Sequence, residues 1–295
     1  MEDHMKRNKF KILTATLALL LFLTGCINPE QKEEGTTPPV DVSQIDKNSI
    51  GSYKTMEYTY LTNVNLATIT TNLDPTYLLL ANKQSELSED FIPAKMTVLT
   101  CATLQAARDY ELDSRAAAAL YAMLAEMQVA GVSDIMVASA YRSYEYQVNL
   151  YDKYLELECG GISNDARRVF GEDYIKANYL DKKIFRLSLE DAHTVVQSYS
   201  ALPGQSEHQT GLCIDFATKE EKEPLTEAFE LTAAYQWLSQ NAYKFGFILR
   251  YPKGKEGITG YTYEPWHYRF VGREAATDIF VGDMTLEQYL QLASN

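Results

Sequence analysis

The sequence predicts a single α+β domain in which a small antiparallel sheet is flanked by helices. Helix-type and strand-type segments are mixed along residues 56–295 without the regular strand–helix alternation that builds parallel sheets. The composition of this range stays globular to the end, with no internal repeat and no second linker. A chain of 295 residues with 46% hydrophobic content can bury a sizeable core.

The first half of this domain contains two predicted helices and one strand. Residues 114–129 (SRAAAALYAMLAEMQV) carry apolar side chains at helical spacing, with Ser114 as the expected N-cap and Gly131 as the stop. Residues 134–139 form a β-type run, and residues 144–158 a polar helix. These elements predict a packed helix next to a strand of the sheet.

Residues 159–190 are charged and open with a glycine pair, so we expect an irregular insertion or lid.

The second half predicts the remaining helices and the rest of the sheet. Two helices are expected at 191–200 and 226–244, and two strands at 246–252 and 266–272. A turn with three glycines joins the strands at 253–260, and residues 285–294 close the chain as a helix.

The N-terminal residues resemble an export signal rather than a part of the folded domain. Residues 5–26 combine four basic side chains with an apolar run from Ile12 to Leu23. This run is too short to cross a hydrocarbon core of about 30 Å at 1.5 Å per residue, so residues 1–26 are predicted to be a signal peptide. It ends in Leu-Thr-Gly-Cys, which resembles the bacterial lipobox, and we expect a lipid anchor at Cys26. The alternative is an ordinary signal peptide that ends near a cysteine by chance.

The rest of the N-terminal region and the overall charge set the expected location. Residues 27–55 are rich in charged, Pro, Gly, Ser and Thr residues, which is typical of a flexible linker. The domain would then be extracytoplasmic, tethered to the bacterial cell membrane, and we expect it to be a monomer. A net charge of −13 disfavours nucleic acid as a partner.

Three cysteines remain after Cys26, so at least one thiol is expected to be unpaired. Cys101 and Cys159 could form a disulfide, with the unpaired state equally compatible with the sequence. Cys213 lies in an apolar run and is expected to be a buried small hydrophobe. There is no Cys-x-x-Cys, so a thiolate zinc site is not supported.

Two short motifs carry candidate metal ligands. In SEHQTGLCIDF (206–216), Leu212 and Ile214 would face the core of a strand, so that Cys213 and Asp215 face the other way, towards His208. In YEPWHYRF (263–270), Pro265 disfavours a helix and would place Glu264 and His267 at a bend where a strand begins.

A catalytic zinc needs three protein donors and an open fourth position. Each histidine alone would more often be structural, but two of the three histidines outside the leader fall in these two motifs, each with a carboxylate partner. The third, His193, is expected to be a surface or helix-packing residue. A carboxylate beside such a metal can take a proton from the bound water. Alternation places Trp266 and Tyr268 on one side of their strand, either in the core or in a groove wall.

The two motifs resemble those of the VanY-type zinc D-Ala-D-Ala carboxypeptidases, SxHxxGxAxD and ExWHxR. SAYRSYEYQ (139–147) also resembles the SxYRSxxxQ segment of this family, whose fold is that of the hedgehog/DD-peptidases. The resemblance implies that His208, Asp215 and His267 bind one Zn²⁺ and that Glu264 is the general base. It implies that Arg142 binds substrate and stabilises charge, and that Gln147 and Ser206 lie in the substrate pocket. A structural ion pair for Arg142, and local hydrogen bonding for Gln147 and Ser206, are the alternatives. Two features depart from the family. Cys213 stands where the family commonly has alanine, and the region 155–190 is longer than the family core needs, which would change the shape of the substrate groove.

The resemblance therefore implies a zinc metallopeptidase that removes the C-terminal D-alanine from peptidoglycan stem peptides. Two alternatives stay open. One is an L,D-carboxypeptidase acting on tetrapeptide stems, and the other is a zinc-containing wall-binding lipoprotein without catalysis. Glu264 argues against the second, because a structural zinc site does not need a free carboxylate beside an open position.

Overall fold

The computed structural model describes residues 42–100, 105–106, 109–219 and 225–294, and the side chains of 105–106 are not described. The predicted signal peptide, its Cys26 and the disulfide candidate Cys101 lie outside these residues. No helix in the described part of the chain is long and apolar enough to span a bilayer.

A five-stranded sheet forms the centre of the domain, with strand order β2-β4-β5-β7-β6. Only β2 and β4 run parallel, and the other three pairs are antiparallel, so the predicted α+β class with a small antiparallel sheet is confirmed. The short strands β1 and β3 form a separate antiparallel pair. The strands are β1 Met96–Val98, β2 Gln105–Ala106, β3 Glu111–Asp113, β4 Met136–Ser139, β5 Cys213–Ala217, β6 Phe247–Leu249 and β7 His267–Phe270.

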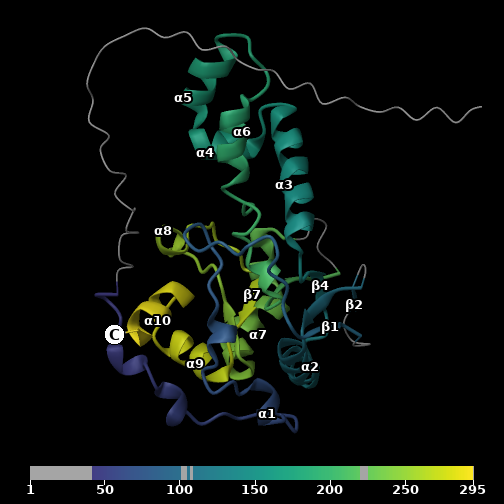
Figure 1. Ribbon diagram of the computed structural model, residues 1–295, viewed down its shortest axis with the longest axis vertical. Coiled ribbons are helices and arrows are strands. Elements are labelled where there is room, and N and C mark those ends of the chain that lie inside the picture. The colour runs from purple at the N-terminus through teal and green to yellow at the C-terminus, as the bar shows by residue number, and fades with distance from the viewer. Residues whose placement is uncertain (1–41, 101–104, 107–108, 220–224, 295) are drawn as a thin grey trace, which may run out of the picture. The chain divides into compact units, whose positions relative to one another are not determined.

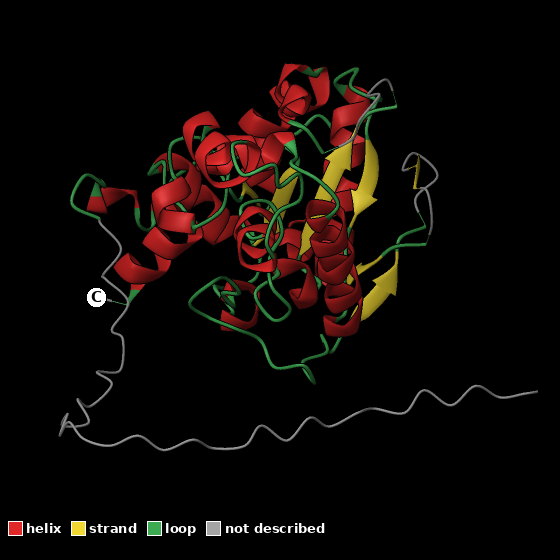
Figure 2. Ribbon diagram, turned by 90° about the horizontal axis from the view of Figure 1, so that it is seen from above, coloured by secondary structure: helices red, strands yellow, loops and turns green. Residues whose placement is uncertain are grey.

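Helices surround this sheet (Figures 1 and 2). The α-helices are α1 Leu66–Ile69, α2 Ser114–Val129, α3 Tyr144–Cys159, α4 Asn164–Phe170, α5 Glu172–Ile175, α6 Leu189–Val196, α7 Ala233–Asn241, α8 Glu256–Thr259, α9 Arg273–Val281 and α10 Leu286–Ala293. The 3₁₀ turns are η1 Lys47–Ser49, η2 Ser52–Lys54, η3 Pro75–Leu78, η5 Glu207–Thr210, η6 Glu227–Leu231 and η7 Ala242–Phe245, and η4, Lys176–Leu180, is a π-helical turn.

The predicted helix at 114–129 is present as α2, and its apolar side is buried against the sheet in the main core. Leu120, Met123 and Met127 are fully buried, as their helical spacing predicts. The predicted N-cap is wrong by one residue. Asp113, not Ser114, caps the helix, because its carboxylate accepts hydrogen bonds from the amides of Arg115 and Ala116.

Residues 159–190 are largely helical, so the prediction of an irregular insertion is wrong. Figure 1 shows α3, α4, α5 and α6 grouped at one end of the domain. Ser163 caps α4 through its hydroxyl, and Ile175, Leu187 and Val195 help to build a separate apolar cluster between these helices. The sequence suggested irregular structure because this cluster forms only when segments distant in sequence pack together.

The last residues of the range predicted to be a linker, 27–55, pack on the domain. The amides of Gly51 and Tyr53 donate to the carboxylate of Asp278 in α9, over 2.7 and 3.2 Å.

Helix α9 was not predicted from the sequence, and the predicted turn at 253–260 contains the short helix α8.

Candidate metal centre

The segment that carries His208 and Asp215 begins with a tight turn and continues as the central strand. After η5, Gly211 adopts φ 67°, and a Cβ there would lie 2.7 Å from Sδ of Met96, so both the backbone conformation and the space favour glycine. Strand β5 then runs with Ile214 in the core and Asp215 on the opposite face. The predicted alternation of this strand is confirmed.

The pairing of β5 with β7 brings the second motif to the first. Asp215 is the direct cross-strand partner of His267, and Ser139 of β4 pairs with Asp215 on the other side. Paired residues of neighbouring strands carry their side chains on the same face, with Cβ atoms about 5 Å apart. The antiparallel register therefore places an aspartate and a histidine, 52 positions apart in the numbering, side by side.

Glu264 reaches the same place from a turn that leads into β7. The amide of His267 donates to the carbonyl of Glu264 over 3.1 Å, and the amide of Glu264 donates to the carbonyl of Tyr251. Pro265 occupies the second position of this four-residue turn, where its fixed φ is favourable. The predicted bend at the strand entrance is present.

Three side-chain donors converge at this face of the sheet. Their ligand atoms, one each from His208, Asp215 and His267, lie within 4.8 Å of one another, and all three side chains are buried. Nε2 of His208 lies 3.1 Å from Oδ2 of Asp215, and Nδ1 of His267 lies 3.1 Å from Oδ1. Oε2 of Glu264 lies 3.3 Å from Nδ1 of His267. The structure thus brings together all four residues that the sequence predicts for a metal and its base.

The hydrogen bonds of His208 prepare its ring for a cation. Nδ1 lies 2.6 Å from the carbonyl oxygen of Ala140, and because a carbonyl can only accept, Nδ1 carries the proton. Nε2 is then unprotonated, and its lone pair can bind a metal ion. It is buried and has no hydrogen-bond partner among the described residues, and the same holds for Oδ1 of Asp215. The bare donor atoms of the His208 imidazole and the Asp215 carboxylate, with the His267 imidazole beside them, fit a Zn²⁺ ion.

The electrostatics of the site keep His208 and Asp215 in the forms that can bind a cation. Burial and the Arg142 guanidinium lower the pKa of His208 to about 4, so this ring is neutral at physiological pH. Burial raises the pKa of Asp215, but the neighbouring histidines outweigh it and hold the pKa well below its usual range. Burial lowers the pKa of His267, and hydrogen bonds to Asp215 and other acidic neighbours raise it overall. A cation at this site would compete with a proton for His267.

The pKa of Glu264 is shifted in the opposite direction to that of Asp215. Burial raises the pKa of its carboxyl above the ordinary glutamate value, despite the hydrogen bond to His267. A base with a raised pKa is better matched to accept a proton near neutral pH. Its side chain keeps 13% of its surface exposed, towards the cavity that borders the site.

Arg142 lies beside the ligands and is fixed in place by Gln147. Nη2 of Arg142 lies 3.5 Å from Oδ2 of Asp215, and Nη1 donates to Oε1 of Gln147 over 2.9 Å. The side-chain nitrogen Nε2 of Gln147 donates in turn to the carbonyl of Ala201. Gln147 is buried behind Arg142, whereas Arg142 and Ser206 line the cavity. Substrate contact by Gln147 stays a prediction, and its observed contacts orient Arg142.

A cavity of about 620 Å³ opens over His208, Asp215 and His267. One wall comes from the helical group, through α3, α4 and the segment after α6, and the other comes from the chain that leads into β7. Its lining includes Tyr146, Leu150, Tyr154, Asp165, Arg168 and Tyr199 from the first wall, and Tyr251, Tyr261, Thr262, Tyr263 and Trp266 from the second. The segment predicted to reshape a groove does form part of its wall.

The remaining predicted residues lie as follows. Tyr268 is fully buried in the core, while Trp266 is half-buried and borders the cavity. His193 lies in α6, where its Nδ1 is 3.1 Å from the hydroxyl of Tyr151. Cys213 is a buried free thiol, and Cys159 is also free, so neither is paired with another described cysteine.

Sequence reasoning missed a buried ionic network behind the metal site. Glu207 has no exposed side-chain surface, and its Oε1 accepts hydrogen bonds from Nε of Arg250 and Nη1 of Arg269, both over 2.8 Å. Arg250 also pairs with Glu287. Burial raises the pKa of Glu207, but the two guanidinium groups outweigh it and hold the pKa well below its usual range. The only sequence signal was the position of Glu207 directly before His208.

Comparison with known proteins identifies the family. Residues 109–273 match the family model of VanY, D-alanyl-D-alanine carboxypeptidase. The chain is 55% identical over 91 residues to YodJ of Bacillus subtilis (strain 168), covering 31% of this chain and 33% of YodJ. It is 33% identical over 214 residues to a D-alanyl-D-alanine carboxypeptidase of Enterococcus faecalis (strain ATCC 700802 / V583), covering 72% of this chain and 65% of that protein. These matches thus span less than two thirds of each of these relatives.

Solved structures agree with this assignment. The LdcB LD-carboxypeptidase is 34% identical, with a TM-score of 0.56 over 73% of this chain and 86% of that one. A mutant of the D,D-pentapeptidase VanY from the VanB-type resistance cassette, solved in complex with Zn(II), is 30% identical with a TM-score of 0.52 over 73% and 99%. VanYB in complex with D-alanine-D-alanine matches at 30% identity with a TM-score of 0.52 over 72% and 97%. Since the family model matches more than half of the chain, and the matched range contains every candidate ligand, the chain belongs to the VanY family of D-alanyl-D-alanine carboxypeptidases.

Proposed function

We propose that this protein is a zinc-dependent carboxypeptidase that removes the C-terminal D-alanine from peptidoglycan stem peptides. One observation carries the proposal. The donor atoms of His208, Asp215 and His267 converge within 4.8 Å at the floor of a cavity, with Glu264 beside them but outside the ligand set. A site that only held a metal would not need this additional carboxylate.

When bound there, zinc would polarise the scissile carbonyl and make a water molecule more acidic. Glu264 accepts the proton of that water at its carboxylate and delivers it to the nitrogen of the departing D-alanine. The exposed part of its side chain faces the cavity, so it can reach both groups. The buried His208 and His267 hold their positions and exclude bulk water from one side of the site.

Arg142 is placed to act on the substrate. Its guanidinium lines the cavity beside Asp215, and Gln147 fixes its direction. A planar guanidinium suits the terminal carboxylate of a peptide or the oxygen charge that develops at the scissile bond. We propose this role for Arg142, and a hydrogen bond to the peptide for Ser206, which lines the same cavity.

The experiment is to load the full-length chain with zinc and incubate it with pentapeptide and tetrapeptide stems. Mass spectrometry should show the loss of one D-alanine from the pentapeptide. The similarity to the LdcB LD-carboxypeptidase supports the second candidate, an L,D-carboxypeptidase, which would instead shorten the tetrapeptide. Binding of both peptides without cleavage of either would leave the third reading, a non-catalytic wall-binding protein, and would refute the enzyme.

We also propose that the protein is exported, attached to the bacterial membrane by a lipid on Cys26, and monomeric. The support is the order of basic residues, apolar run and Leu-Thr-Gly-Cys in residues 5–26. Metabolic labelling with a radioactive fatty acid should mark the wild-type chain and not Cys26→Ala. Sedimentation of the detergent-solubilised protein should give the mass of one chain.

A further inference from the structure

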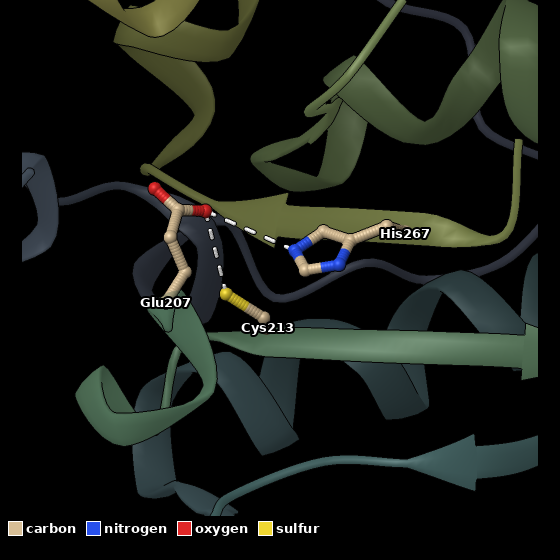
Figure 3. Close-up of side chains that lie close together, drawn as sticks. All are labelled: Glu207, Cys213 and His267. Atoms are coloured by element: carbon tan, nitrogen blue, oxygen red, sulfur yellow. Dashed lines mark hydrogen bonds and ion pairs between the residues drawn. The ribbon is translucent and has the colours of Figure 1, made fainter. Parts of the chain in front are cut away.

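The face of His267 that points away from the predicted metal meets a second group of side chains. Nδ1 faces Asp215 and Glu264, whereas Nε2 faces Oε2 of Glu207 at 3.8 Å (Figure 3). Sγ of Cys213 lies 3.6 Å from the same oxygen. Figure 3 shows Glu207 and Cys213 on the same side of the imidazole ring. The ring therefore stands between two acidic sites.

These three side chains could also hold a cation, since their ligand atoms lie within 4.8 Å of one another. The charges around them argue against it. Two guanidinium groups, of Arg250 and Arg269, already bind Oε1 of Glu207 and compensate its charge. A second cation would be placed within a few ångströms of both, in a buried site where repulsion between like charges is weakly screened.

The same contacts prevent Glu207 from acting as a base or as a ligand of the metal at Asp215. One of its oxygens is occupied by the two arginines, and the other faces the thiol and the imidazole. Glu207 is an ionised acceptor in a fixed position. What it can do is accept the proton of Nε2 of His267, while the Cys213 thiol donates to the same oxygen.

We propose that Glu207 is a positioning residue that fixes His267 as an Nδ1 ligand of the zinc ion. The Cys213 thiol holds the Oε2 atom of Glu207 in place by donating to it. The inference rests on the proposed zinc site. With Nε2–H directed at a carboxylate, Nδ1 is left unprotonated and faces the other ligands. The 3.8 Å separation is expected to close to a hydrogen bond when the cation holds the ring from the other side. Outer partners of this kind typically contribute about 10- to 100-fold in metal affinity.

His208 and His267 should then bind the ion through different ring nitrogens. His208 keeps its proton on Nδ1, which faces the carbonyl of Ala140, and binds through Nε2. His267 keeps its proton on Nε2 and binds through Nδ1. Long-range ¹H–¹⁵N spectra of the zinc-loaded wild-type chain, labelled in the histidine rings, read this directly, with His193 as an internal reference. A proton on Nδ1 of His267 overturns the proposal, and it does so without any mutation.

A matched pair of variants tests the contribution to affinity. Glu207→Gln and Glu287→Gln each remove one charge from the same buried network around Arg250, but only Glu207 faces His267. Competition with a chelator should show zinc binding about 10- to 100-fold weaker in Glu207→Gln and nearly unchanged in Glu287→Gln. Equal losses in both would mean that Glu207 acts only through the stability of the network.

The outcome for Glu207 is separable from that for the proposed function. Zinc binding with the two expected tautomers but no peptide cleavage would refute the function and leave the positioning role intact. Cleavage by a protein in which His267 carries its proton on Nδ1 would support the function and refute the positioning role. The imino proton of Nε2 should also shift upfield in Glu207→Gln, because the charged acceptor is replaced by a neutral one.

Discussion

Replacing Glu264 by glutamine separates metal binding from catalysis. The two side chains have the same shape, and the turn around Glu264 depends on backbone hydrogen bonds to Tyr251 and His267, so the fold should be preserved. A glutamine cannot accept the proton. A general base typically contributes about 100- to 10,000-fold, which corresponds to roughly 3–5 kcal/mol of barrier height. Peptide cleavage should therefore fall by this factor.

Zinc affinity supplies the second half of this prediction. Glu264 is not among the three residues whose donor atoms converge, so zinc affinity should change by no more than a few-fold, about 1 kcal/mol. Chelator competition measures the affinity, and mass spectrometry measures the cleavage rate. Glu156→Gln, an exposed change on α3, is the control and should match wild type in both assays. Wild-type turnover in Glu264→Gln would refute the assigned role, and loss of zinc together with activity would make Glu264 a ligand.

Three further predictions concern the same site. His208→Ala should lose more zinc affinity than the roughly 10–100-fold expected for an outer partner, because it removes a ligand; isothermal titration with zinc checks this. Because the pKa of Glu264 is raised by burial, the acidic limb of the kcat/KM profile should have its midpoint above the ordinary glutamate value of about 4.3, with activity rising as pH increases; a midpoint at or below that value contradicts it. Arg250→Met leaves two buried carboxylates without their shared partner, so urea unfolding should show a loss of about 3–5 kcal/mol; a loss below about 1 kcal/mol would mean that the network is relaxed by water.

The predictions that succeeded depend on local patterns. Residues 114–129 form a helix because strong helix formers and a buried apolar side agree, and tertiary contacts reinforce that preference. The alternation around Asp215 was readable because a strand places successive side chains on opposite faces. The bend at Glu264 followed from Pro265, which restricts the residue before it.

The predictions that failed depend on contacts between distant segments. The helices between 159 and 190 are held by an apolar cluster that joins α4, α5 and α6, and no short pattern signals it. Helix α9 contains Thr277, Ile279 and Val281, which favour strands, and it is stabilised by packing on β6 and η7 instead.

The same difference between local patterns and contacts of distant segments applies to the site. The two motifs predicted residues that the structure brings together, but the environment of His267 was not predictable from them. Glu207 reaches the far side of that ring only because Arg250 of the segment after β6 and Arg269 of β7 hold its carboxylate. Cys213 acquires a neighbour rather than simply filling space, since it precedes Asp215 by two positions on the same face of β5.

The most direct test of the account is an anomalous diffraction map at the zinc absorption edge, from crystals of the zinc-loaded protein. It should show one peak, bonded to Nε2 of His208, the carboxylate of Asp215 and Nδ1 of His267, with a fourth position facing the cavity and Glu264. A peak between Glu207, Cys213 and Nε2 of His267 would contradict the assignment of the ligands, and so would the absence of zinc from a folded protein.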